Sequence, residues 1–91
     1  MEVPISVLKV GVVGNIGDKE QRRVKKKWLK GVKNTLMRRF SNTMYNDILF
    51  IAENDRLMDF LLSSNCLPIV VDRPRNVDVL VDLDRCEITF C

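Results

Sequence analysis

The sequence predicts a small α/β sandwich of two or three layers, formed by a single domain of residues 1–91. Stretches rich in β-branched residues alternate with two helical patterns, an arrangement that favours parallel strands joined by crossovers. Two short turns near the C-terminus favour antiparallel hairpins instead. The expected element order is therefore βαβαβββ, in a mixed sheet with parallel first three strands and antiparallel C-terminal hairpins.

The first strand and the first helix are joined by a glycine-rich turn. Residues 4–14, PISVLKVGVVG, are rich in valine and isoleucine and end in glycine, which predicts a strand. Asp18 precedes a long amphipathic pattern, and Gln21 follows it at the spacing of a capping box, so we expect the helix to begin there. The loop after this helix is marked by Ser41, Asn42 and Asn46.

The second half of the chain predicts one short helix and four strands. Residues 47–54, DILFIAEN, form an apolar strand pattern, after which Asn54 or Asp55 caps a helix. The later strands are expected in LPIVVD, VDVLVDL and CEITF. Residues 73–76, RPRN, are typical of a turn, so we expect the third and fourth strands to form an antiparallel hairpin.

Composition excludes several classes of function. The chain has no histidine, so Ser-His and Cys-His catalytic pairs cannot be built from it alone. Its three cysteines form no C-x-x-C pair, which disfavours a disulfide framework and a zinc site. No segment approaches the roughly 18 apolar residues of a membrane span, and Glu2 stands where a secretory signal carries positive charge. We expect a cytoplasmic or nuclear protein without metal or cofactor.

Basic charge is concentrated in the first predicted helix. Residues 19–39 contain ten Lys or Arg and one Glu, a net charge of +9, whereas the rest of the chain has five bases and eleven acids, a net charge of −6. Helical spacing predicts a buried apolar arc centred near Trp28 and formed by Val24, Trp28, Leu29, Val32, Leu36 and Phe40. The opposite arc carries the residues that we call the basic row: Arg23, Lys26, Lys27, Lys30, Lys33 and Arg38.

The basic row indicates a binding function. Like charges one turn apart destabilise a helix by about 0.2 to 0.5 kcal/mol, so an almost uniformly positive face carries a cost. The leading interpretation is a small non-enzymatic binding or regulatory protein whose basic row contacts a nucleic-acid backbone without sequence preference, or an acidic protein. A solvated face partly neutralised by the protein's own acids is the ordinary alternative. A homo-oligomer formed through an edge strand also stays open.

A second interpretation starts from the glycine-rich turn. The segment GVVGNIGDKEQ resembles the first strand-turn-helix of Rossmann-like nucleotide-binding domains. The resemblance implies that Gly14, Asn15 and Gly17 hold a nucleotide phosphate, in a nucleotide- or phosphate-binding domain that is a fragment or subunit of an enzyme. Asp18 and Glu20 in the first helical turn are expected to oppose an anion there. A nucleotide site predicts a pocket at this turn, whereas a binding module predicts an open basic surface.

Acidic residues follow two of the predicted strands. Glu53, Asp82 and Asp84 resemble the Glu and D-x-D metal ligands of Toprim domains, which implies a magnesium site. If RPRN forms a hairpin, Asp82 and Asp84 lie at the opposite edge of the sheet from Glu53, too far away to share a metal ion. We therefore expect no metal site, and aspartates that form turns.

Overall fold

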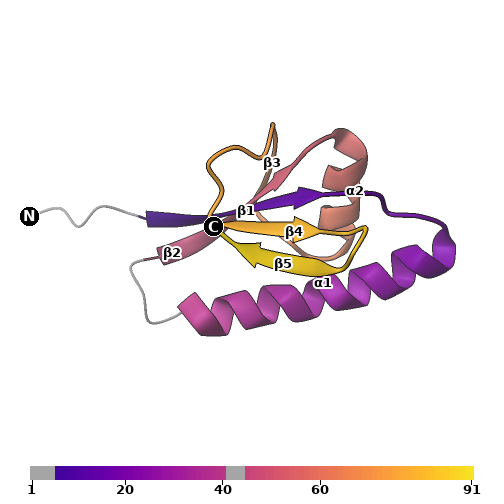
Figure 1. Cartoon of the computed structure of the whole chain (residues 1–91), viewed down its shortest axis with the longest axis horizontal. Coiled ribbons are helices and arrows are strands. Elements are labelled where there is room, and N and C mark those ends of the chain that lie inside the picture. The colour runs from indigo at the N-terminus through magenta and orange to yellow at the C-terminus, as the bar shows by residue number, and fades with distance from the viewer. Residues whose placement is uncertain (1–5, 41–44) are drawn as a thin grey trace, which may run out of the picture.

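Five strands and two helices follow one another in the computed structural model, which describes residues 6–40 and 45–91 (Figure 1). The loop predicted at Ser41 and Asn42 lies outside the described residues, and Asn46 belongs to a strand. The predicted order βαβαβββ is confirmed. In chain order the elements are β1 (Ser6–Val13), α1 (Lys19–Phe40), β2 (Tyr45–Ala52), α2 (Asp55–Ser63), β3 (Ile69–Val71), β4 (Val79–Asp82) and β5 (Glu87–Phe90).

The strands form one mixed sheet in the order β3-β2-β1-β4-β5. β1, β2 and β3 are parallel, and β4 and β5 form an antiparallel hairpin, as the sequence predicts. One detail of the prediction is wrong, because β4 is not a neighbour of β3. It pairs in parallel with β1, with Val10 opposite Val79, so residues 73–76 are not a hairpin turn. The two edges of the sheet are β3 and β5, and a homo-oligomer formed through either edge stays a prediction.

The segment between β3 and β4 crosses over β1. Residues 72–78 pass so close to this strand that a Cβ on Gly11 would lie 2.8 Å from the Cβ of Pro74. The crossing therefore depends on a glycine at this position of β1. Val10 and Val12, the neighbours of Gly11, are fully buried on the other face of the sheet. The segment thus covers the face opposite α1, as its position above the sheet in Figure 1 shows.

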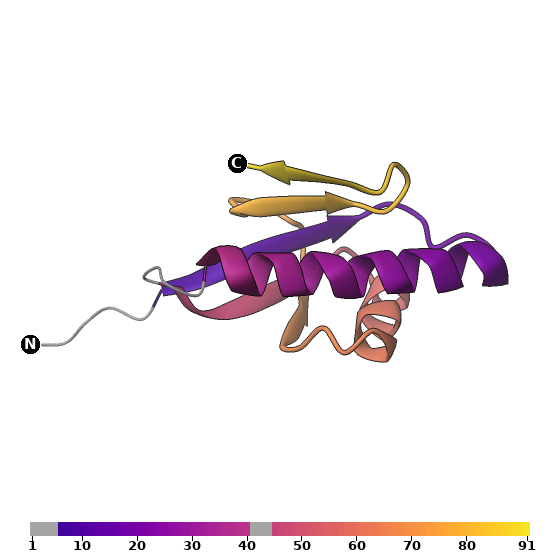
Figure 2. The same ribbon diagram turned by 90° about the horizontal axis from the view of Figure 1, so that it is seen from below.

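Both helices pack on the other face of the sheet, so of the two predicted arrangements the protein adopts the two-layer one. Figure 2 looks onto this side, with α1 running in front of the strands. A single hydrophobic core fills the space between the layers. Its fully buried members come from both helices and from the three central strands, and include Leu8, Val10, Val12, Leu29, Leu36, Phe50, Phe60, Leu61, Val79 and Val81.

The two helices follow the carboxyl ends of β1 and β2, α1 after residues 14–18 and α2 after residues 53–54. Before α1, the Asp18 carboxylate accepts a hydrogen bond from the Gln21 N–H (2.9 Å), and the Gln21 side chain accepts one from the Asp18 N–H (3.3 Å). This is the predicted capping box. Before α2, the Asn54 side chain accepts a hydrogen bond from the Leu57 N–H (3.0 Å), so Asn54 is the N-cap. Both helix starts therefore lie at one end of the sheet.

The apolar face of α1 differs from the predicted one. The buried stripe consists of Leu29, Val32 and Leu36, whereas Trp28 is only partly buried and packs against the core from its edge. Val24 is 64% exposed. The first turns of α1 extend past the ends of the strands in Figures 1 and 2, so no strand lies beneath them. The prediction that Val24 is buried and that Trp28 lies at the centre of the buried face is therefore wrong.

Candidate nucleic-acid interface

Most of the basic row lies on the exposed side of α1. Four of its residues are exposed, and Lys26 and Lys33 are partly buried. The ordinary alternative is that the protein's own acidic residues neutralise such a face. Among the described residues, however, no carboxylate forms an ion pair with Arg23, Lys26, Lys27, Lys30 or Lys33. Except for Lys33, this part of the row is an open positive surface.

Two lysines of α1 are held by backbone carbonyl groups. The Lys33 ammonium donates to the carbonyl oxygen of Asn65, just after α2. The Lys25 ammonium, which the predicted row does not include, donates to the carbonyl oxygen of Asn15 (2.7 Å) in the glycine-rich turn. These bonds tie α1 to the turn and to the end of α2. Lys33 is therefore less available to a ligand than the sequence suggests.

The glycine-rich turn has a conformation that requires its glycines. Gly14 and Gly17 have φ angles of +105° and +82°. A Cβ on Gly14 would also lie 2.9 Å from the backbone nitrogen of Asp84. The N–H of Asn15 donates to the Asp84 carboxylate (3.0 Å). Of the three residues that the Rossmann-like resemblance implies for phosphate binding, Asn15 thus already has its backbone N–H and carbonyl group bonded within the protein.

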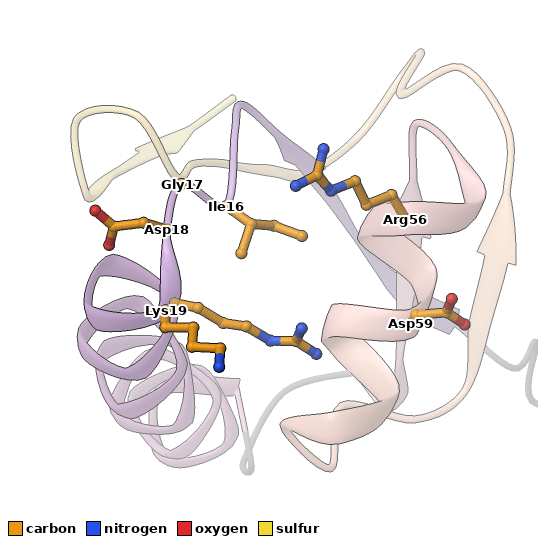
Figure 3. Close-up of a pocket in the computed structure, with 7 residues that line it drawn as sticks. Ile16, Gly17, Asp18, Lys19, Arg56 and Asp59 are labelled. Carbon is orange, nitrogen blue, oxygen red and sulfur yellow. The ribbon is translucent and has the colours of Figure 1, made fainter.

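Two cavities lined by described residues adjoin the glycine-rich turn. The smaller one, of about 220 Å³, is lined by Gly14, Asn15, Ile16, Gly17, Asn54, Arg56 and Leu57. The larger one, of about 540 Å³, lies between the first turns of α1 and α2 (Figure 3). We call it the basic cleft; its lining residues are Ile16, Gly17, Asp18, Lys19, Arg22, Arg56 and Asp59.

The basic cleft brings together cations that the sequence does not show as a group. Lys19 and Arg22 come from the start of α1 and Arg56 from the start of α2. Their proximity follows from the parallel pairing of β1 with β2, which brings both helix starts to the same end of the sheet. The carboxylates of Asp18 and Asp59 point outward, away from the centre of the cleft, in Figure 3. The Asp18 carboxylate also caps α1, and the capping hydrogen bond holds it in this position.

The acidic residues Glu53 and Asp82 lie at the same end of the sheet, contrary to the prediction. Because β4 runs parallel to β2 and not backward, Asp82 and Glu53 both lie at the carboxyl ends of parallel strands. The Asp82 carboxylate accepts hydrogen bonds from the N–H groups of Asp84 (2.9 Å) and Arg85 (3.4 Å), so it forms a turn, as expected. Within residues 6–40 and 45–91, no group of three His, Cys, Asp or Glu is placed to hold a metal ion.

Comparison with known proteins leaves the site to be interpreted from its own chemistry. No protein-family model, no curated protein and no solved structure matches the chain. Over the described residues, neither helix is long and apolar enough to cross a membrane. The fold and the site together define a small α/β domain that presents a positive helix face and a basic cleft at the carboxyl end of its parallel strands.

Proposed function

We propose that this protein binds nucleic acid by contacting the phosphate backbone with the basic row of α1. The observation that carries the proposal is a run of cations along α1 in which the side chains of Arg23, Lys26, Lys27 and Lys30 form no hydrogen bond or ion pair with the described residues. From Arg23 to Arg38 the row extends over roughly 22 Å at 1.5 Å per helical residue. That length covers on the order of six phosphates at 3.4 Å along one strand of a duplex.

The expected mode of binding is independent of sequence. The aromatic residues of α1, Trp28 and Phe40, are partly buried and pack on the core, so the basic row presents no ring on which a base can stack. Backbone contacts position a protein on nucleic acid but do not read its sequence. The net charge of −6 on the remainder of the chain favours an orientation in which α1 faces the polyanion.

We do not propose the binding of a whole nucleotide as the function. The cavities at the glycine-rich turn do fit the pocket that this interpretation requires. However, the N–H of Asn15 is occupied by Asp84, and the apolar side chains that line the two cavities are only Ile16 and Leu57. A nucleobase is usually held by a more apolar surface.

The test is a salt titration with a matched pair of triple variants. In the first, Lys26→Gln, Lys27→Gln and Lys30→Gln remove three charges of the row whose ammonium groups have no bonding partner among the described residues. Folding should survive, because Gln and Lys have similar helix propensities. In the second, Lys9→Gln, Arg73→Gln and Arg75→Gln remove three charges around a cavity on the face opposite the helices.

Binding of fluorescent duplex DNA is measured by anisotropy between about 50 and 200 mM salt. The slope of log K against log salt should fall in magnitude by about 2.7 in the first variant, since each phosphate contact adds about 0.9. The second variant should keep the slope of the wild type. Absence of binding at the lowest salt, or an unchanged slope in the first variant, would overturn the proposal. Binding of polyglutamate in place of DNA would then indicate an acidic protein partner.

A further inference from the structure

We infer that the basic cleft binds a terminal phosphate group of the nucleic acid, an inference that rests on the proposed function. The cleft lies at the start of the helix that carries the basic row. Arg22, Lys26 and Lys30 follow one another at intervals of four residues, so they form one stripe along α1. A strand that follows this stripe toward the start of α1 reaches the cleft.

The charge of the cleft suits a phosphate monoester better than an internal diester. Lys19, Arg22 and Arg56 line one space, and none of their side chains has a hydrogen-bond or ion-pair partner among the described residues. A terminal phosphate has a charge of about −1.5 to −2 at neutral pH, whereas an internal phosphate has a single negative charge. Guanidinium groups offer paired donors that match phosphate oxygens. Three cations around one space therefore favour the more highly charged end group.

The orientation of the side chains is consistent with an anion between the helices. In Figure 3, Arg56 extends from α2 toward Ile16 and Gly17, and Lys19 lies on the α1 side of the space between the helices. The carboxylates of Asp18 and Asp59 are directed away from that space. The cleft is thus positive inside, although acidic residues contribute to its rim.

The glycine-rich turn adds backbone donors to the cations. Ile16 and Gly17 line both cavities, and their N–H groups have no acceptor in the described part of the chain. Unbonded N–H groups in a turn beside a helix start are suited to an anion. A volume of about 540 Å³ also falls within the range of ligand sites, so the cleft has room for a phosphate with its sugar.

The first test compares single-stranded oligonucleotides of one sequence that carry a 5′-phosphate, a 3′-phosphate or hydroxyl groups at both ends. The wild type should bind one of the phosphorylated strands about tenfold more tightly than the hydroxyl-ended strand, a difference equivalent to 1.4 kcal/mol. Arg56→Gln should abolish this preference and leave the salt slope for the hydroxyl-ended strand unchanged. Arg75→Gln is the matched control, since it removes the same group on the opposite face and should keep the preference. Equal affinity of the wild type for all three strands would overturn the inference.

The second test uses inorganic phosphate alone, so that the cleft is examined without the basic row. Phosphate added to the ¹⁵N-labelled protein at constant ionic strength should give saturable amide shifts at Ile16, Gly17 and Arg56. These shifts should disappear in the Arg22→Gln variant. If they occur while no oligonucleotide binds, the proposed function is wrong and the phosphate site stands. If oligonucleotides bind without preference and phosphate gives no shifts, the inference alone is wrong.

Discussion

The packing of α1 can be tested by comparing Leu29→Ala with Val24→Ala. Leu29 is fully buried between the helix and the sheet, whereas Val24, near the start of α1, is 64% exposed. The predicted apolar arc contains both residues, so only the structure distinguishes them. The two substitutions should therefore have effects of opposite sign on the free energy of unfolding.

The expected magnitudes follow from burial. Removing a fully buried leucine side chain costs about 2.7 to 5 kcal/mol, which includes the cavity that remains. A domain of this size has a free energy of unfolding on the order of 5 to 14 kcal/mol, so Leu29→Ala should remove a large part of it. Val24→Ala removes little buried surface and introduces a better helix former, so it should stabilise by up to about 0.5 kcal/mol.

Thermal unfolding followed by circular dichroism at 222 nm gives the comparison directly. A loss of about 3 kcal/mol lowers Tm by roughly 12 to 24 °C in a domain of this length, whereas Val24→Ala should leave Tm unchanged or slightly higher. A lower Tm in the Val24→Ala variant than in the Leu29→Ala variant would refute the observed docking of α1. It would show that the helix is rotated toward the arc centred on Trp28.

Two further predictions concern the glycines and the cysteines. Gly31→Ala should raise the free energy of unfolding by about 0.5 to 1 kcal/mol in urea denaturation, because a Cβ there meets no atom within 4 Å. Gly14→Ala should lower it, because its φ is +105° and the added Cβ would lie 2.9 Å from the backbone of Asp84. Burial raises the pKa of the Cys66 thiol from its usual value of 9.0, an effect partly offset by the nearby charges of Lys33 and Lys30. The neutral thiol therefore contributes its full stability below pH 9.0 and loses that contribution as the pH rises through the folded-state pKa. The difference in the free energy of unfolding between wild type and Cys66→Ala should therefore shrink above pH 9.0. A thiol reagent should modify the exposed Cys91 in the native protein and Cys66 only after unfolding; equal rates at the two would contradict this burial.

The element order was predictable from local patterns, whereas the partner of β4 was not. Asp18 with Gln21, and Asn54, give capping signals that act within one helical turn, and both are confirmed. The segment RPRN indicates a change of chain direction but does not specify the strand with which β4 pairs. Seven residues extend to about 24 Å, enough to cross the roughly 14 Å between β3 and β4. A parallel crossover usually needs a dozen residues or more, but short strands need less chain to return.

The site was predictable only in part, for a related reason. The periodicity of α1 correctly placed Lys27 and Lys30 on its exposed side. The basic cleft depends on Arg22 and Arg56, which lie more than thirty positions apart and are brought together by the sheet. The predicted position of Asp82 was wrong for the same reason. The end of the sheet at which Asp82 lies depends on the direction of β4, and that direction follows from its parallel pairing with β1.

The passage of residues 72–78 over Gly11 also has a consequence for the order of folding. Val10 is paired with Phe50 on one side and with Val79 on the other, so one partner lies 40 positions away and the other 69. The longer closure adds only about 0.5 kcal/mol of chain entropy. However, the crossing segment can settle only on a β1 strand that is already in place, so β1, α1 and β2 should assemble before β4 docks. Long sequence separation slows folding, so the docking of the C-terminal hairpin on β1 should be slower than the pairing of β1 with β2.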